Sequence, residues 1–178
     1  SHHLIMALLV VEVIVLFLIF LFVMLRHIYS YFSSNTEREE RDKIFYALCQ
    51  SLESGQKEPL AALKPYAGTQ LLLKEVEAFS ERLSGGEWEH LKGTITSKYL
   101  RPEANKHFES RSWMNRNFAA RVLALTAYPE DQPLMLKLLE DPVFLVRSHA
   151  ARALACLKTP EGIFKLLKHM SKEFGYAR

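Results

Sequence analysis

The residue types that carry most enzyme chemistry are present, but they do not form a known catalytic pattern. Seven histidines are spread over 178 residues, and none belongs to a His-Glu-x-x-His motif or a cysteine–histidine cluster. The Gly85-Gly86 pair lacks the following Lys-Ser/Thr of a phosphate-binding loop. Glu87, Glu89 and His90 are close in sequence, but on a helix they point in different directions. The sequence therefore predicts a non-catalytic protein with no metal ion and no cofactor.

Basic side chains dominate the second half of the chain. Residues 98–178 carry 14 basic and 8 acidic side chains, a net charge of +6, whereas residues 37–97 carry 8 and 11, a net charge of −3. A basic surface suits an acidic protein segment, an anionic lipid or an anionic ligand. The alternative is a solvated face with structural arginines. The candidate binding residues are Arg111, Arg116, Arg121, Arg147, Arg152, Lys165, Lys168 and Lys172.

Trp113 is the aromatic candidate for the same surface, because it precedes Arg116 by about one helical turn. It could stack against a partner, or it could pack in the core. Core packing is the favoured interpretation for Trp113 and for Trp88. Nucleic acid is disfavoured as a partner, because aromatic side chains are not interleaved with the basic ones.

The N-terminal segment has the composition of a membrane span. Residues 4–25 are 22 residues of Leu, Ile, Val, Phe, Met and Ala, interrupted only by Glu12. A helix of this length extends about 33 Å, and the hydrocarbon core of a bilayer is about 30 Å thick. The basic start and the cleavage site of a signal peptide are missing. We therefore expect an uncleaved single transmembrane helix over residues 4–25 that continues to about residue 32.

The flanking charges predict the orientation of this span. Arg26, Arg38, Arg41 and Lys43 follow it, and no lysine or arginine precedes it. The positive-inside rule then places the N-terminus outside and the C-terminal part in the cytoplasm. Glu12 is costly inside a membrane. It either contacts a membrane-embedded partner or stays neutral and reaches toward the outer interface.

The rest of the chain is predicted to be helical, because no run alternates with a period of two. The capping-box pattern Thr36 to Glu39 predicts a helix start. Gly68-Thr69 precedes a second helix, and a third carries Trp88 to Tyr99 and is predicted to stop at Arg101-Pro102. We expect a juxtamembrane segment at 26–36, degenerate helical repeats at 37–110 and clear repeats at 111–178.

The repeats are visible at an offset of 31 residues. Arg116 aligns with Arg147, Ala119-Ala120-Arg121 with Ala150-Ala151-Arg152, and Leu123 with Leu154, while Pro129 aligns with Pro160. Each unit is predicted to be a helix, a proline-marked turn and a second helix, and such units stack into a solenoid. Asp141-Pro142 and Thr159-Pro160 are predicted to cap helices, with proline at the first helical position.

These residues resemble the HEAT-repeat family, in particular the short bacterial repeats of the phycobilin-lyase type. Residues 141–154 are similar to the family pattern Asp-x-x-x-x-Val-Arg-x-x-Ala-Ala-x-Ala-Leu, whereas the copy at Trp113 lacks the Asp and has Asn115 in place of Val. The resemblance implies an all-α solenoid of antiparallel helix pairs and a structural ladder that includes Arg116. The residues with implied structural roles are Asp141, Pro142, Arg147, Ala150, Ala151 and Leu154.

Two functions remain open from the sequence. The favoured one is a non-catalytic scaffold or adaptor, anchored in the bacterial inner membrane, whose solenoid binds a protein in the cytoplasm. Its membrane partner could be a multi-pass enzyme such as a glycosyltransferase, or a transporter. The alternative is a membrane-tethered sensor that binds an anionic small molecule or nucleotide on the basic face. The last predicted helix is apolar on more than one side, so we expect further chain or a partner to cover it.

Overall fold

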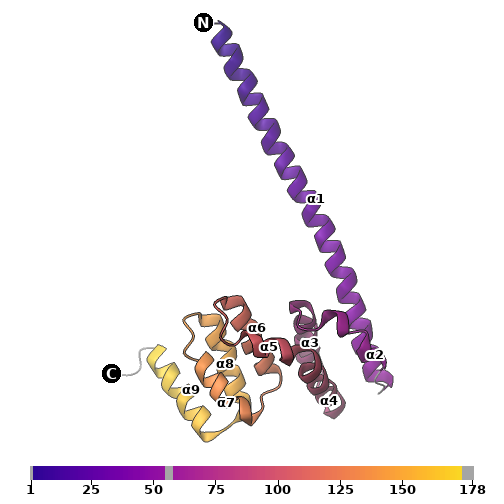
Figure 1. The fold of residues 1–178 in the computed structure, drawn as a ribbon, viewed down its shortest axis with the longest axis vertical. Helices are drawn as coiled ribbons and strands as arrows, with labels where there is room; N and C mark the ends of the chain where they lie inside the picture. The colour runs from indigo at the N-terminus through magenta and orange to yellow at the C-terminus, as the bar shows by residue number, and fades with distance from the viewer. Residues whose placement is uncertain (1, 55–57, 174–178) are drawn as a thin grey trace. The chain divides into compact units, whose positions relative to one another are not determined.

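A computed structural model describes residues 2–54 and 58–173, without the side chains of residues 2–5, 7–11, 29–35, 54, 58, 172 and 173. Within these residues the chain is helical and contains no strand, which confirms the predicted all-α class (Figure 1). The elements are α1 (His2–Ser54), α2 (Glu58–Ala61), η1 (Lys64–Tyr66), α3 (Gln70–Arg82), α4 (Gly86–Ile95), η2 (Thr96–Leu100), α5 (Arg101–His107), α6 (Trp113–Leu125), η3 (Pro129–Asp131), α7 (Gln132–Leu138), α8 (Phe144–Leu157) and α9 (Pro160–Glu173).

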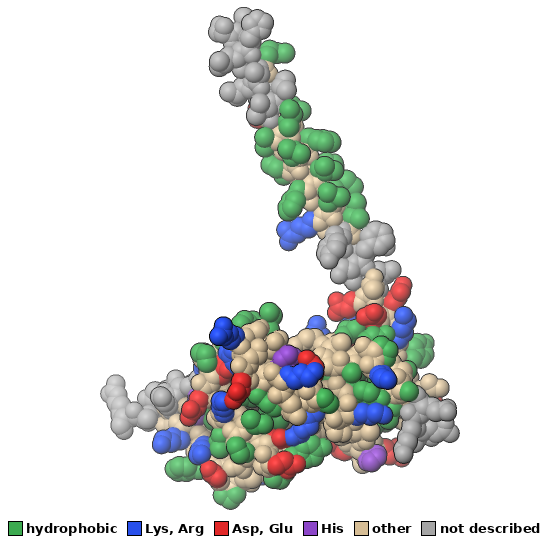
Figure 2. All heavy atoms as spheres, viewed as in Figure 1, with side chains coloured by type: hydrophobic (Ala, Val, Ile, Leu, Met, Phe, Trp, Pro, Cys, Tyr) green, Lys and Arg blue, Asp and Glu red, His purple; other side chains and the backbone are tan. Residues whose placement is uncertain are grey.

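The chain divides into two compact units, residues 1–43 and residues 44–178. In the first unit, the apolar side chains of residues 13–25 are all 43–67% exposed on α1, and Figure 2 shows hydrophobic side chains along this stretch. Within the described part of the chain, no helix has both the length and the sustained apolar content of a membrane-crossing segment. The span predicted at residues 4–25 extends into side chains outside the described residues.

The predicted helix start at Thr36 is wrong, because α1 continues through this residue to Ser54. A capping box stabilises a helix at its N-terminus, where the first backbone N–H groups lack carbonyl partners. At Thr36 the preceding turns of α1 already supply those partners. No glycine or proline occurs before Gly55 to interrupt the helix.

The core of the second unit begins on the last turns of α1. Ile44 and Leu48 are fully buried together with Leu72 and Val76 of α3. Thr69 precedes α3, as predicted, and its hydroxyl caps the helix by accepting a hydrogen bond from the Leu72 N–H at 3.2 Å. The preceding turn requires glycine at position 68, where φ is +72° and an added Cβ would lie 2.8 Å from the Cβ of Glu103.

The predicted stop at Arg101-Pro102 is also wrong. The chain passes from α4 through one π-helical segment, η2, directly into α5. The Arg101 N–H bonds to the carbonyl of Thr96, five residues back, so the helix widens just before the proline. Pro102, which donates no backbone hydrogen bond, follows this wider turn directly in α5.

The predicted repeat architecture is confirmed in the last third of the chain. The first unit is α6, the proline-marked turn η3 and α7, and the second is α8 followed by α9. Helices α6 and α8 pack side by side (Figure 1), and their small residues Ala119, Ala120, Ala150 and Ala153 have no exposed surface. The absence of larger side chains at these positions allows the two helices to approach closely.

The two predicted helix caps of this region have different outcomes. The hydroxyl of Thr159 accepts the Gly162 N–H at 3.2 Å at the start of α9, as predicted. The prediction for Asp141-Pro142 is wrong, because α8 begins only at Phe144, after Val143. The carboxylate of Asp141 instead accepts the Val143 N–H at 2.9 Å and holds the loop before the helix.

Candidate interaction surface

Arg116 and Asp141 form a buried ion pair between consecutive repeats. The Arg116 Nε lies 2.5 Å from one Asp141 oxygen, and its Nη2 lies 3.1 Å from the other. The side chains are only 15% and 5% exposed. Such a bidentate pair fixes the spacing between α6 and the loop that leads into α8. This contact is of the kind that the HEAT resemblance implies.

Arg116 and Arg147 hold the backbone in the same way in the two repeats. Arg116 Nη1 donates to the carbonyls of Ser110 at 2.8 Å and Arg111 at 3.1 Å. Arg147 Nη1 donates to the carbonyls of Asp141 at 2.9 Å and Pro142 at 3.0 Å, positions exactly one 31-residue repeat later. Each arginine therefore ties the loop before its helix to the helix itself.

Electrostatics keeps Asp141 ionised in this buried position. Burial alone would raise the pKa of its carboxyl group. The hydrogen bonds from Arg116 and from the Val143 N–H, together with the charges of Arg116 and Arg147, outweigh burial and hold the pKa below its usual value. The same pair raises the pKa of Arg116, mainly through the hydrogen bond to Asp141.

Arg121 joins α6 to α3. Its Nε donates to Glu77 Oε1 at 3.0 Å, its Nη2 pairs with Glu77 Oε2, and its Nη1 donates to the Gln70 side chain at 2.9 Å. The neighbouring His149 has a lowered pKa, because it is partly buried and because the charges of Arg121 and Arg152 disfavour its protonated form; Glu77 opposes this shift. We call the contacts of Arg121 with Glu77 and Gln70 the α3–α6 clamp. Because these contacts join two helices of the chain, the role of the clamp is structural.

The predicted basic surface thus divides into two groups. Arg116, Arg121 and Arg147 are held in contacts within the chain. Arg111, Arg152 and Lys168 are exposed and form no ion pair within the described residues. Lys165 forms a solvent-exposed ion pair with Glu161 at 3.0 Å. The side chain of Lys172 lies outside the described residues. Arg116, Arg121 and Arg147 therefore make structural contacts, whereas the exposed residues remain candidates for binding.

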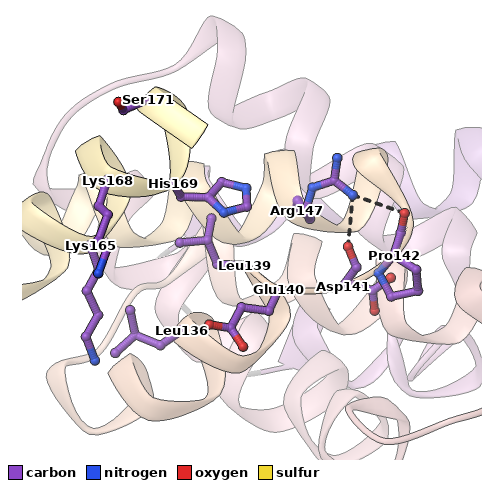
Figure 3. Close-up of a pocket in the computed structure, with 10 residues that line it drawn as sticks. All are labelled: Leu136, Leu139, Glu140, Asp141, Pro142, Arg147, Lys165, Lys168, His169 and Ser171. Carbon is purple, nitrogen blue, oxygen red and sulfur yellow. Dashed lines mark hydrogen bonds between the residues drawn. The ribbon is translucent and has the colours of Figure 1, made fainter. Parts of the chain in front are cut away.

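A hollow of about 1030 Å³ contains two of these exposed cations (Figure 3). Lys165 and Lys168 line it from α9, with His169 beside them. Leu136 of α7 and Leu139 provide apolar surface, and the remaining lining residues are Glu140, Asp141, Pro142, Arg147 and Ser171. The hollow is half open, so it can admit a chain segment as well as a small molecule.

Exposed apolar side chains form two further patches. On α9, Ile163, Phe164, Leu167 and Met170 are 42–68% exposed. We call these four residues the α9 apolar face. The second patch comprises aligned pairs at the starts of α6 and α8, which are Trp113-Met114 and Phe144-Leu145.

The core position predicted for Trp113 is wrong, because its side chain is 44% exposed, whereas Trp88 is buried as expected. Phe144 and Leu145 were not among the predicted binding residues. The 31-residue offset could have pointed to them, because it aligns them with Trp113 and Met114. Glu77 carried no such signal, because its partner Arg121 lies 44 residues further along the chain.

The structure adds no catalytic or metal-binding candidate. Within the described residues that were searched, no group of three His, Cys, Asp or Glu side chains is placed to hold a metal ion. Glu12 lies exposed on α1, and Glu87, Glu89 and His90 are exposed on α4.

Residues 104–178 match the family model of HEAT repeats. The matched segment begins in α5 and includes α6, α7, α8 and α9, and it supports the HEAT-repeat resemblance for this part of the chain. No curated protein and no solved structure matches the chain significantly. HEAT repeats generally serve as non-catalytic scaffolds that bind proteins, and the HEAT segment of this chain is consistent with that role.

Proposed function

We propose that the protein is a membrane-anchored scaffold whose HEAT segment binds a protein partner. The α9 apolar face is the observation that carries this proposal. In a stack of HEAT repeats, the apolar face of each helix pair is covered by a neighbour. Four large apolar side chains exposed on one helix form a patch that favours contact with another protein surface.

The membrane anchor rests on the sequence of residues 4–25 and on the surface of α1. The described side chains from residue 13 to residue 25 are apolar and exposed, as they would be in contact with lipid. The basic residues that follow support a cytoplasmic HEAT segment, and the short bacterial type of the repeats favours the bacterial inner membrane. Glu12 then serves as a contact with a membrane-embedded subunit.

A multi-pass membrane enzyme, such as a glycosyltransferase, or a transporter fits both contacts. Such a partner offers helices for Glu12 within the bilayer and cytoplasmic segments for the HEAT segment. No residue of the chain selects among these partners, so the proposal concerns the class of complex.

The sensor hypothesis receives less support. It requires several arginines that converge on an anion. Arg116, Arg121 and Arg147 already donate to acceptors within the chain, which leaves Arg111 and Arg152 as the exposed arginines among the candidates. An anionic small molecule would therefore meet fewer available donors than the sequence suggested.

The proposal is tested by extracting the full chain from its native membranes with a mild detergent and measuring the mass of the particle by native mass spectrometry. We expect a defined complex with a membrane protein. In Glu12→Leu the yield of that partner should fall, and in Phe164→Glu/Leu167→Glu the partner contact of the HEAT segment should be lost. Recovery of the wild-type chain only as a lone monomer would contradict the scaffold, and full partner yield with Glu12→Leu would contradict the role of Glu12.

A further inference from the structure

The hollow beside α9 is lined from two stacked helices that differ in length. Helix α7 has 7 residues and α9 has 14. At about 1.5 Å per residue, α9 is about 10 Å longer than α7. The lining residues of α9 run from Lys165 to Ser171, and Leu136, Leu139 and Glu140 line the hollow from the end of α7 and the residues that follow it. The hollow therefore lies between α9 and the C-terminal end of α7 (Figure 3).

The walls of this hollow combine apolar surface with positive charge. Leu136 and Leu139 line it together with Lys165 and Lys168 (Figure 3). Lys168 forms no ion pair within the described residues. Lys165 has only the exposed partner Glu161, and pairs of this kind contribute little and exchange readily. Both ammonium groups are thus available to a new carboxylate.

The other charged residues that line the hollow are less available to an incoming anion than the two lysines. Asp141 is paired with Arg116, and Arg147 Nη1 donates to the carbonyls of Asp141 and Pro142. Glu140 is exposed and lines the hollow just after the end of α7. Negative charge is therefore favoured next to α9 and disfavoured next to the end of α7, which gives the occupant a preferred orientation.

The dimensions and donors suit a peptide segment more than a small anion. A phosphate or nucleotide site needs donors that converge on one point, and here the two lysines stand on one helix, while the guanidinium of Arg147 donates to backbone carbonyls. A volume of about 1030 Å³ is at the upper end of small-molecule sites, and the hollow is half open. Apolar surface and cations side by side match a segment that carries both apolar and acidic residues.

We propose that this hollow binds an acidic segment of the protein partner. An apolar side chain of the segment packs on Leu136 and Leu139, and its carboxylates pair with Lys165 and Lys168. This inference rests on the proposed scaffold function, because it names the chemistry that the scaffold recognises in its partner. It concerns a surface different from the α9 apolar face.

The first test selects peptides from a random display library on the full chain in nanodiscs of zwitterionic lipid. The double variant Lys165→Glu/Lys168→Glu serves for counter-selection. The expected peptides are rich in Asp and Glu and contain at least one large apolar residue. Enriched peptides without acidic residues, or peptides that bind the double variant equally well, would overturn the inference.

The second test measures the affinity of one selected peptide by fluorescence anisotropy. The double variant should bind it about tenfold or more weakly, because each lysine pairs with a carboxylate. The matched control is Arg111→Glu/Arg152→Glu, which makes the same change in net charge at exposed positions outside the hollow and should weaken binding less than about twofold. Equal loss in both double variants would show a nonspecific charge effect and contradict the site. Equally tight binding of ATP that displaces the peptide from the wild type would assign the hollow to a small anion instead.

The native complex separates failure of this inference from failure of the scaffold itself. If the wild-type chain yields a complex and Lys165→Glu/Lys168→Glu retains it in full, the acidic-segment inference is wrong and the scaffold stands. If the wild-type chain yields no complex, the scaffold is wrong. Unfolding curves of all variants, followed by tryptophan fluorescence, check that each one folds.

Discussion

Removal of Asp141 should destabilise the second unit far more than removal of an exposed acid. Asp141→Ala takes away hydrogen bonds with Arg116 at 2.5 and 3.1 Å and with the Val143 N–H at 2.9 Å, and it leaves the Arg116 charge 15% exposed. Breaking a buried ion pair by deleting one partner costs about 3–5 kcal/mol. Arg116 keeps the carbonyls of Ser110 and Arg111, so we expect a loss of about 3 kcal/mol, at the low end of that range.

Two further variants make the reasoning specific. Asp141→Asn keeps an acceptor for Val143 and removes the charge, and should cost about 1.5 kcal/mol. Glu109→Ala breaks the Lys137–Glu109 pair at 2.6 Å, whose side chains are 62% and 78% exposed. It should leave the free energy of unfolding nearly unchanged in spite of the short distance, because the pair is in solvent.

The assay is urea unfolding of the full chain, followed by tryptophan fluorescence. Trp88 and Trp113 are the two tryptophans of the chain, and both lie in the second unit, so the signal reports on the unfolding of that unit. With a urea dependence of about 2 kcal/mol per molar, Asp141→Ala should lower the midpoint by about 1.5 M. Equal shifts for Asp141→Ala and Glu109→Ala would refute the ladder as a stabilising contact.

Three other variants test neighbouring contacts. Arg121→Ala should lower the free energy of unfolding by about 2 kcal/mol, because it opens the α3–α6 clamp. It should also raise the pKa of His149 in an NMR titration, because the Arg121 charge lowers that pKa in the wild type. An unchanged pKa of His149 would contradict this coupling. Because the folded state holds the pKa of His149 below its ordinary 6.5, the unfolded state binds more protons just below that pH. The free energy of unfolding should therefore decrease as the pH is lowered from about 7 to about 5.5, and the decrease should be smaller in His149→Gln. An equal decrease in the wild type and in His149→Gln would show that His149 is not its source. Thr159→Ala deletes the cap on the Gly162 N–H and should cost about 1 kcal/mol, measured as faster amide hydrogen exchange in the first turn of α9; unaltered exchange there would show that the cap contributes nothing.

The sequence was most informative where local chemistry and periodicity coincide. The 31-residue offset predicted the two helix pairs, and Thr159 was correctly identified as a cap because it precedes an isolated helix start. Thr36 has the same signature but lies inside a continuous helix, and sequence does not reveal whether the preceding turn is already helical. The helix end predicted at Pro102 was wrong for a related reason, because the π-helical segment that accommodates this proline has no local sequence signal.

Contacts between distant residues were beyond sequence reasoning. The roles of Arg121 and of the hollow depend on which helices stack and on the lengths at which α7 and α9 end. Trp113 was expected in the core because tryptophan usually packs there, but it stands in the first turn of α6, where the side chain reaches solvent. Arg116 and Arg147 could be assigned structural roles only through the family resemblance.

The central claim is that the HEAT segment holds a protein through the α9 apolar face. Its most direct test is site-specific photocrosslinking in native membranes, with a crosslinking amino acid in place of Phe164, which is 68% exposed, and in a control chain in place of the exposed Arg152. The proposal predicts one abundant crosslinked protein from position 164, absent from position 152 and lost when Leu167→Glu is added. Equal crosslinking from both positions, or crosslinking at position 164 that is unaffected by Leu167→Glu, would contradict it.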